Sequence, residues 1–260
     1  MLKLTDQVGN LISLERAAQR IVSLVPSQTE LLHYFDLHDR VVGITKFCIH
    51  PDEWYQTKER IGGTKNLNIS KIQEIKPDLI IANKEENTKR QIEFLKKNYQ
   101  VYISDINTAE DAYQMIRDVG ILTAKEQKAV DLIDDIQESF DEMVKLKGSV
   151  LYFIWKDPYM VCGTDNFIHS IINEIGLTNV ITQRRYIEIS KEQIQKLKPD
   201  YIFLSSEPFP FNEEHKRELE TISNAKVYIV DGEMFSWYGS RMLKMKTYFK
   251  NLEQKVRLQS

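Results

Sequence analysis

The sequence repeats one segment, a helix followed by a strand, in its two halves. Residues 68–81 read NISKIQEIKPDLII, and residues 188–203 read EISKEQIQKLKPDYIF. When the copies are aligned on Lys-Pro-Asp, Ile72 and Ile75 superpose on a second apolar pair with the same three-residue spacing, which places each pair on one helix face. Proline ends each helix because its ring clashes with continued α geometry. The apolar residues that follow predict a buried strand.

A second pair of similar segments lies further along each half, VYISD at 101–105 and VYIVD at 227–231. Each half also begins with an apolar strand, at 21–25 or 150–155, followed by a helical stretch. Strands that alternate with helices are typical of βαβ units with a mainly parallel sheet. Short apolar strands fit sheets that helices cover on both faces. We therefore predict two α/β lobes of one design.

A helical segment, residues 108–148, connects the predicted lobes. From Ala124 to Leu146 the chain has neither glycine nor proline, and apolar residues recur every three or four positions, as on one helix face. At about 1.5 Å per residue, a helix over 124–146 is roughly 35 Å long. We expect a first lobe at 1–107 and a second at 149–260. A stiff connection of this kind permits only small relative movement, unlike a glycine-serine linker.

Composition narrows the class of function. The chain has 260 residues, 42% of them hydrophobic and 28% charged, with a formal net charge of −3. These values are ordinary for a soluble globular protein, and no basic stripe points to nucleic acid. The N-terminus has no basic region followed by a sustained apolar run, so neither a signal peptide nor a membrane span is visible. We expect a monomer, cytoplasmic as written and extracytoplasmic if a leader precedes it.

The usual enzyme motifs are absent from the sequence. It contains no G-x-G-x-x-G after a strand, no phosphate-binding P-loop, no H-E-x-x-H and no G-x-S-x-G. The two cysteines, Cys48 and Cys162, lie in different halves, and free thiols are the simplest interpretation. We therefore expect a binding protein rather than an enzyme.

Three segments, in this order, resemble a known family: RIVSLVPSQTELL at 20–32, IGGTKNLNISKIQEIKPDLII at 61–81 and FIHSIINEIGLTNVI at 167–181. Together with two lobes and a long linking helix, they are similar to the class III, helical-backbone substrate-binding proteins of ABC importers. The resemblance is strongest to members that bind cobalamin, and siderophore and haem binders are related. It implies two Rossmann-like lobes joined by a backbone helix, with a ligand cleft between them. It also implies no intrinsic cofactor, a bound corrinoid or ferric chelate, and an importer permease dimer as partner.

Aromatic residues gather in the loops that such a fold would place beyond the strands. No helical or strand periodicity buries these rings, so each either packs under its loop or contacts a ligand. Flat rings with a few polar groups suit a large planar ligand. By the resemblance, Phe47 stands where cobalamin binders have an aromatic contact and Tyr186 where they have a second-lobe tryptophan, while their first-lobe tryptophan falls near Thr64. The predicted ligand-binding residues are Ser27, Phe47, Thr64, Lys65, Trp155, Tyr159, Tyr186, Phe209, Phe235, Trp237, Tyr238 and Arg241.

Charged and metal-binding side chains have alternative interpretations. Arg241 and Lys65 suit ligand carboxylates or phosphates, yet Arg241 equally suits a pairing with Asp231 or Glu233. Cys48 and His50 lie in one loop as candidate metal ligands, with loop packing as the simpler interpretation. Family members dock on the permease through one surface glutamate on each lobe. The second-lobe position matches Glu192. The first-lobe position is a serine, with Glu74 the nearest carboxylate.

Three functions remain open from the sequence. The first is a receptor that delivers cobalamin or another corrinoid to an importer, with a siderophore or haem as the alternative cargo. The second is a cytoplasmic carrier of a corrinoid or metal chelate. The third is a two-lobed α/β enzyme that acts in the cleft.

Overall fold

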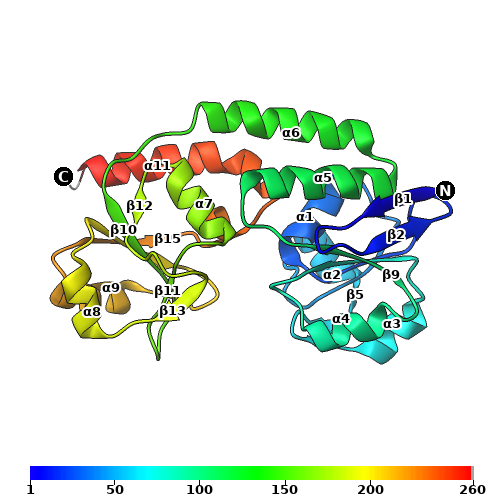
Figure 1. Cartoon of the computed structure of the whole chain (residues 1–260), viewed down its shortest axis with the longest axis horizontal. Helices are drawn as coiled ribbons and strands as arrows, with labels where there is room; N and C mark the ends of the chain where they lie inside the picture. The colour runs from blue at the N-terminus through cyan, green and yellow to red at the C-terminus, as the bar shows by residue number, and fades with distance from the viewer. Residues whose placement is uncertain (259–260) are drawn as a thin grey trace. The chain divides into compact units, whose positions relative to one another are not determined.

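The computed structural model describes residues 1–258, which form two compact units (Figure 1). The first unit, lobe 1, contains Met1–Ile106, Glu110–Gln137 and Tyr238–Arg241. The second, lobe 2, contains Asn107–Ala109, Glu138–Trp237 and the residues from Met242 onward. The short segment Tyr238–Arg241 therefore belongs to lobe 1, although it follows nearly all of lobe 2 in the sequence.

Lobe 1 is built on a five-stranded parallel sheet. Its apolar strands are buried on both faces, as the sequence predicts for a parallel sheet. The strand order is β5 (Glu59–Arg60), β4 (Val41–Ile44), β3 (Ile21–Ser23), β8 (Leu79–Asn83) and β9 (Gln100–Ser104). Two hairpins accompany it, β1 (Leu2–Thr5) with β2 (Leu11–Leu14), and β6 (Gly62–Gly63) with β7 (Asn66–Leu67).

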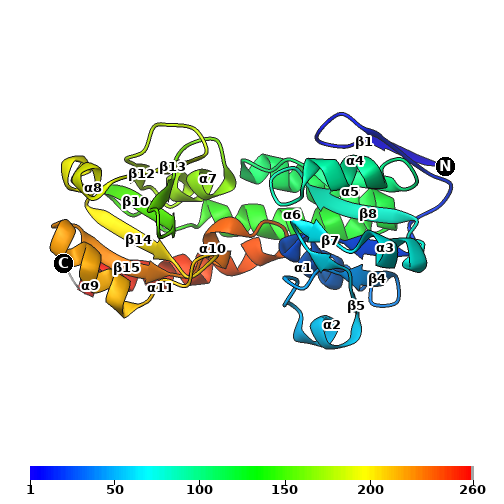
Figure 2. The same ribbon diagram turned by 90° about the horizontal axis from the view of Figure 1, so that it is seen from below.

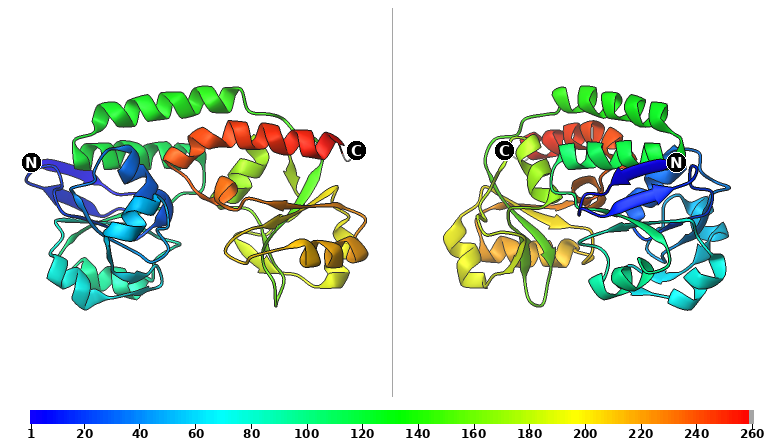
Figure 3. Two further views of the ribbon diagram at one scale, coloured as in Figure 1. Left: turned by 180° about the vertical axis from the view of Figure 1, so that it is seen from behind. Right: turned by 45° about the vertical axis from the view of Figure 1, so that its right-hand side comes forward.

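Helices cover both faces of this sheet (Figure 3). On one face, Ile72 and Ile92 pack in a single core cluster with Val22 and Ile80 of the strands. On the other face, the Tyr102 hydroxyl donates to a carboxylate of α5. The helices are α1 (Pro26–Tyr34), α2 (Asp52–Thr57), α3 (Ile69–Ile75), α4 (Lys89–Leu95) and α5 (Ala109–Thr123).

Lobe 2 has a mixed sheet in which the central strands are parallel. The predicted parallel core is present. The chain turns back directly after β10, so β11 pairs antiparallel with β10, and β13 in turn pairs antiparallel with β11. The order is β13 (Tyr186–Glu188), β11 (Met160–Cys162), β10 (Ser149–Trp155), β14 (Tyr201–Ser205) and β15 (Lys226–Val230), and β12 (Thr178–Asn179) also pairs with β10.

The two faces of the lobe 2 sheet hold different cores. Ile194 and Leu219 join the strand residues of one face, whereas Phe235 packs against Phe203 and Phe249. Figure 2 shows β15 leading into α10 and on to α11. The helices are α7 (Phe167–Glu174), α8 (Lys191–Leu197), α9 (Glu213–Ile222), α10 (Glu233–Ser236) and α11 (Met245–Leu258), with a 3-10 turn at Ser240–Lys244.

Both copies of the repeat end their helix in the same way. Lys76 after α3 and Lys198 after α8 adopt left-handed backbone conformations, with φ of 50° and 45°. Each lysine is followed by the repeated proline, which cannot continue a helix. The predicted helix-to-strand repeat is therefore present in both lobes.

The linking helix is shorter than the sequence predicts. Helix α6 covers Glu126–Asp141, whereas the apolar spacing predicts a helix over 124–146. Ala124, with a φ of 54°, separates α5 from α6. Beyond α6, Leu146 is buried, but its backbone N–H donates to the Ile175 carbonyl at 2.7 Å. The Leu146 N–H therefore donates to a residue distant in the sequence, and not to a carbonyl one turn earlier as it would in a longer helix.

Candidate functional site

Polar side chains meet where the parallel strands of lobe 1 end. The Gln28 amide nitrogen donates to the Ser104 hydroxyl at 2.5 Å, and Asn83 Nδ2 donates to the same hydroxyl at 3.0 Å. The Gln28 side chain is fully buried, and its Oε1 has no hydrogen-bond partner among residues 1–258. An unpaired buried oxygen is uncommon and costs free energy. Ser104 lies in the VYISD segment at the end of β9, and only this repeated segment marks it in the sequence.

Tyr238 belongs to the same part of lobe 1, near Ser27. Burial raises the pKa of the Tyr238 phenol, and the Glu86 carboxylate raises it further, whereas the neighbouring hydroxyls of Ser104 and Ser27 lower it. Gly239 follows with a φ of 91°, a conformation that suits glycine. The sequence-predicted residues Ser27 and Tyr238 therefore lie together, and both are buried.

Arg241 forms a buried ion pair with helix α1. Its Nε lies 2.8 Å from Glu30 Oε2, and only 7% and 14% of the two side chains are exposed. The sequence suggests a ligand carboxylate or phosphate, Asp231 or Glu233 as the partner, whereas the partner in the folded chain is Glu30. The pair attaches the segment after α10 to the first helix of lobe 1.

The loop after β4 presents the most exposed ring among the predicted site residues. Phe47 is 50% exposed, and the Lys46 ammonium lies 5.1 Å from its ring centroid. The ring rests on Gly63, where an added Cβ would lie 3.1 Å from Phe47 Cε2. Thr64 is buried, whereas Lys65 is exposed and donates through Nζ to the Glu85 carbonyl.

Cys48 lies in the buried core rather than at the loop surface. Its Sγ is within hydrogen-bond distance of the hydroxyls of Thr29 and Thr45, at 3.1 and 3.2 Å. Burial raises the pKa of the thiol, which disfavours the thiolate that a metal requires. His50, half-buried, is not in the one group of three potential ligands found in residues 1–258.

Three predicted rings of lobe 2 are at least partly exposed. Trp155 ends β10 and is 40% exposed, and its ring centroid lies 5.5 Å from that of Phe209 in a T-shaped arrangement. Phe209 and Tyr186 are half-buried. These rings remain available for contact with a ligand from this lobe.

The other predicted rings of lobe 2 are buried by contacts within the lobe. Trp237 is 7% exposed, and its indole nitrogen donates to Glu207 Oε1 at 3.0 Å. Tyr159 donates its hydroxyl to Glu218 Oε1 at 2.8 Å, and Phe235 lies in the core. Loop position did not distinguish these rings from Trp155 because only the folded chain shows which of them have packing partners.

The two predicted docking glutamates are both exposed. Glu192 lies in the first turn of α8, and Glu74 lies in α3. Both residues are therefore accessible to another protein.

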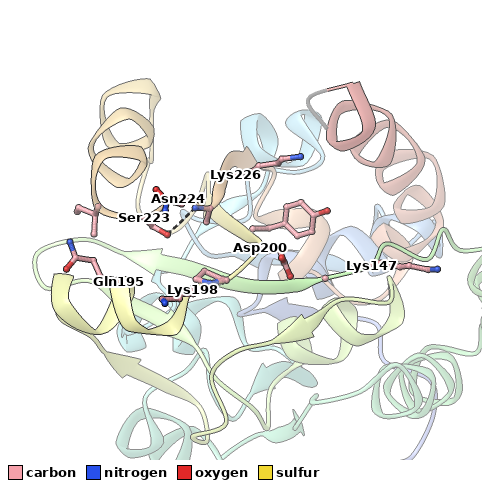
Figure 4. Close-up of a pocket in the computed structure, with 12 residues that line it drawn as sticks. Lys147, Gln195, Lys198, Asp200, Ser223, Asn224 and Lys226 are labelled. Atoms are coloured by element: carbon pink, nitrogen blue, oxygen red, sulfur yellow. Dashed lines mark hydrogen bonds between the residues drawn. The ribbon is translucent and has the colours of Figure 1, made fainter.

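A cavity of about 800 Å³ lies at the opposite, amino ends of the lobe 2 strands (Figure 4). Lys147, Lys198 and Lys226 line it, together with Asp200. Lys198 caps the end of α8, where a cation balances the negative end of the helix dipole. No predicted site residue lines this cavity, so we do not assign the ligand to it.

The family becomes clear from a comparison with protein-family models. The model described as "Periplasmic binding protein" matches residues 21–228, which is most of the chain. The chain belongs to this family. Its members bind solutes and are not enzymes, so the predicted family and the absence of an enzyme function are both confirmed.

Three relatives show how far the similarity extends. An uncharacterized ABC transporter substrate-binding lipoprotein of Bacillus subtilis is 28% identical and covers 90% of this chain and 79% of its own. The vitamin B12 binding protein of Vibrio cholerae has a solved structure with a TM-score of 0.75 and 22% identity, over 91% of this chain and 98% of that one. The structure of a siderophore binding protein, BauB, has a TM-score of 0.78 and 17% identity, over 96% of this chain and 97% of that one. At these identities the structures demonstrate the fold alone, which confirms two α/β lobes with parallel sheets.

In residues 1–258, no helix is both apolar enough and long enough to cross a membrane.

Proposed function

We propose that this protein captures a metal chelate, a corrinoid such as cobalamin in the first instance, and delivers it to an ABC importer permease. The observation that carries the proposal is one exposed ring at the carboxyl end of each sheet, Phe47 in lobe 1 and Trp155 in lobe 2. In open α/β sheets ligands bind at that end of the strands. Relatives described as vitamin B12 binding and siderophore binding support a metal chelate as the class of ligand.

The exposed rings supply affinity in this proposal. Phe47 and Trp155 would lie against apolar faces of the ligand, with Phe209 and Tyr186 as further contacts. An aromatic ring buries a large apolar area for little loss of side-chain entropy, which suits a flat macrocycle. Lys46 already lies over the Phe47 ring and would remain at the rim, near the polar periphery of the ligand.

Polar groups supply orientation. Lys65 is exposed and is the proposed contact for a ligand acceptor. Ser27, Thr64, Tyr159, Phe235, Trp237, Tyr238 and Arg241 are buried, so we propose that they support the contact surface from below. A metal centre would be carried by the ligand, because the buried thiol of Cys48 is poorly suited to coordinate it. Glu192 and Glu74 are the proposed docking points for the permease.

Fluorescence titration of the purified protein tests the function. The probes are cobalamin, cobinamide, haem and a ferric hydroxamate siderophore, each with free tryptophan as the inner-filter control. Quenching of Trp155 that saturates at submicromolar cobalamin or cobinamide supports the corrinoid. Saturation by haem or the siderophore instead would replace the corrinoid and retain the chelate receptor. No saturation by any probe would overturn the proposal.

A further inference from the structure

Two histidines and a glutamate meet in lobe 1 outside the residues assigned to the ligand. His33 lies in the last turn of α1, His38 lies in the turn that follows, and Glu53 lies in the first turn of α2. One potential ligand atom from each of the three lies within 4.8 Å of the others. Two imidazoles with one carboxylate form a donor set typical of divalent transition metals.

Trp54 holds the two imidazoles in place. Its ring is fully buried, and its centroid lies 5.3 Å from that of His33 and 5.4 Å from that of His38, both in T-shaped arrangements. The ring centroids of His33 and His38 lie 4.9 Å from each other. Because the rings pack against a rigid buried indole, their nitrogens are pre-positioned at little further entropic cost.

His33 is well suited to coordinate a metal. Its side chain makes no hydrogen bond within residues 1–258, and the ring is half-buried. Glu53 is exposed, so its carboxylate can rotate toward the rings.

His38 is partly committed to another partner. The Trp54 indole N–H donates to His38 Nδ1 at 2.7 Å. An indole nitrogen can only donate, so His38 Nδ1 accepts and the proton of the neutral ring lies on Nε2. A metal at Nε2 requires that proton to leave that nitrogen. Lys58 adds a nearby positive charge, since its Nζ donates to the His38 carbonyl. Both features weaken metal binding.

We propose that His33, His38 and Glu53 form a binding site for one divalent transition-metal ion of the zinc class. Bonds of about 2.0–2.2 Å require ligand atoms about 3.3 Å apart in a tetrahedral site. Rotation of the exposed Glu53 and a small movement of the rings close the remaining gap. Water completes the coordination, as at other three-ligand zinc sites. This site is separate from chelate capture and does not depend on the proposed function.

The Trp54 hydrogen bond provides a sharp internal test. In Trp54→Phe the donor to His38 Nδ1 is lost while an apolar ring remains, so the His38 proton can move to Nδ1 and leave Nε2 free. We therefore expect Trp54→Phe to bind the metal more tightly than the unaltered protein. A packing role for the histidines predicts no such gain. Circular dichroism and thermal unfolding show whether the variant is folded.

The experiment is calorimetric titration of chelator-treated protein with Zn²⁺, followed by Ni²⁺ quenching of tryptophan fluorescence. We expect one Zn²⁺ to bind per chain. Loss of an outer-shell partner lowers metal affinity roughly 10- to 100-fold, and His33→Gln and Glu53→Gln should each lower it by at least as much. His169→Gln, in lobe 2, is the matched histidine control and should bind as before. Absence of Zn²⁺ binding, or equal binding by Glu53→Gln, would overturn the proposal. Glu53 is exposed, so that variant remains informative even if His33→Gln does not fold.

Discussion

The Asp200 carboxylate accepts hydrogen bonds from both the backbone N–H and the hydroxyl of Ser149, at 2.7 and 2.8 Å. Asp78, its counterpart in the first copy of the repeat, accepts from the backbone N–H groups of Gln19 and Arg20, at 2.8 and 2.9 Å. In each lobe, the aspartate of Lys-Pro-Asp therefore connects the starts of two neighbouring strands by hydrogen bonds, β3 and β8 in lobe 1 and β10 and β14 in lobe 2. The repeated aspartate thus has a structural role in both lobes.

Replacement of this aspartate should destabilise the protein. Asp200→Ala removes two charge-assisted hydrogen bonds, and we expect a loss of about 1 kcal/mol at this exposed site. Asp78→Ala should cost a similar amount. Urea unfolding measures both, with Asp39→Ala, an exposed aspartate in a turn, as the control. Equal stability of Asp200→Ala and the control would contradict this role.

Glu218 should make the stability of the protein depend on pH. Hydrogen bonds from Lys156 and Lys191 lower its pKa from 4.5 to about 2. Because the pKa is lower in the folded state, the stabilisation is complete above about pH 4.5 and is lost as the pH falls toward 2. We expect a loss of about 1–2 kcal/mol after allowance for solvent screening.

Glu218→Gln tests this pH dependence. The variant should be less stable at pH 7, and its free energy of unfolding should fall less between pH 5 and pH 2.5. Glu220→Gln, on the same helix, is the control, because Glu220 lies 4.0 Å from Lys216, whereas Glu218 lies 2.5 and 2.9 Å from its two lysines. An unchanged pH profile for Glu218→Gln would rule out the expected contribution.

The buried pair of Arg241 and Glu30 should be costly to break. Arg241→Met leaves the Glu30 carboxylate without this partner in a largely buried position, and we expect a loss of about 3 kcal/mol. Arg241→Met with Glu30→Gln should lose less than the sum of the single changes. A double-mutant cycle from denaturant unfolding measures the coupling, and additive losses would contradict it.

Both thiols should react slowly in the folded protein. Cys48 and Cys162 are buried, and burial raises the pKa of the Cys48 thiol. The thiolate is the nucleophile, so a disulfide reagent should modify both only at the rate of opening of the structure. We expect slow labelling at pH 7.5 and rapid labelling of two thiols in guanidinium. Immediate labelling of Cys48 in buffer would mean that its loop opens readily.

Phe47 should contribute directly to ligand affinity if it contacts the ligand. Phe47→Ala should weaken the binding of the chelate about 10-fold or more, because a ring contact is worth about 1–2 kcal/mol or more. Phe94, also exposed but on α4, is the matched control, and Phe94→Ala should bind normally. Equal affinities in the fluorescence titration would show that Phe47 lies outside the contact surface.

The local elements of this protein could be predicted from the sequence. The Lys-Pro-Asp repeat predicted the ends of α3 and α8 because proline cannot continue a helix, and the apolar runs after it predicted β8 and β14. The order of segments predicted the family. The predicted end of α6 was wrong, because the hydrogen bond from the Leu146 N–H to the Ile175 carbonyl is a long-range contact that helical spacing does not show.

Tertiary structure decided which predicted site residues are exposed. Phe47, Trp155, Phe235 and Trp237 all lie at or after the end of a strand in the sequence. Only Phe47 and Trp155 remain exposed, because α11 covers Phe235 and Glu207 accepts a hydrogen bond from the indole of Trp237. The sequence by itself determined the repeat and the elements on either side of each Lys-Pro-Asp, since these depend on neighbours along the chain. Burial and ion pairing, such as Arg241 with Glu30, 211 residues apart, depend on neighbours in space.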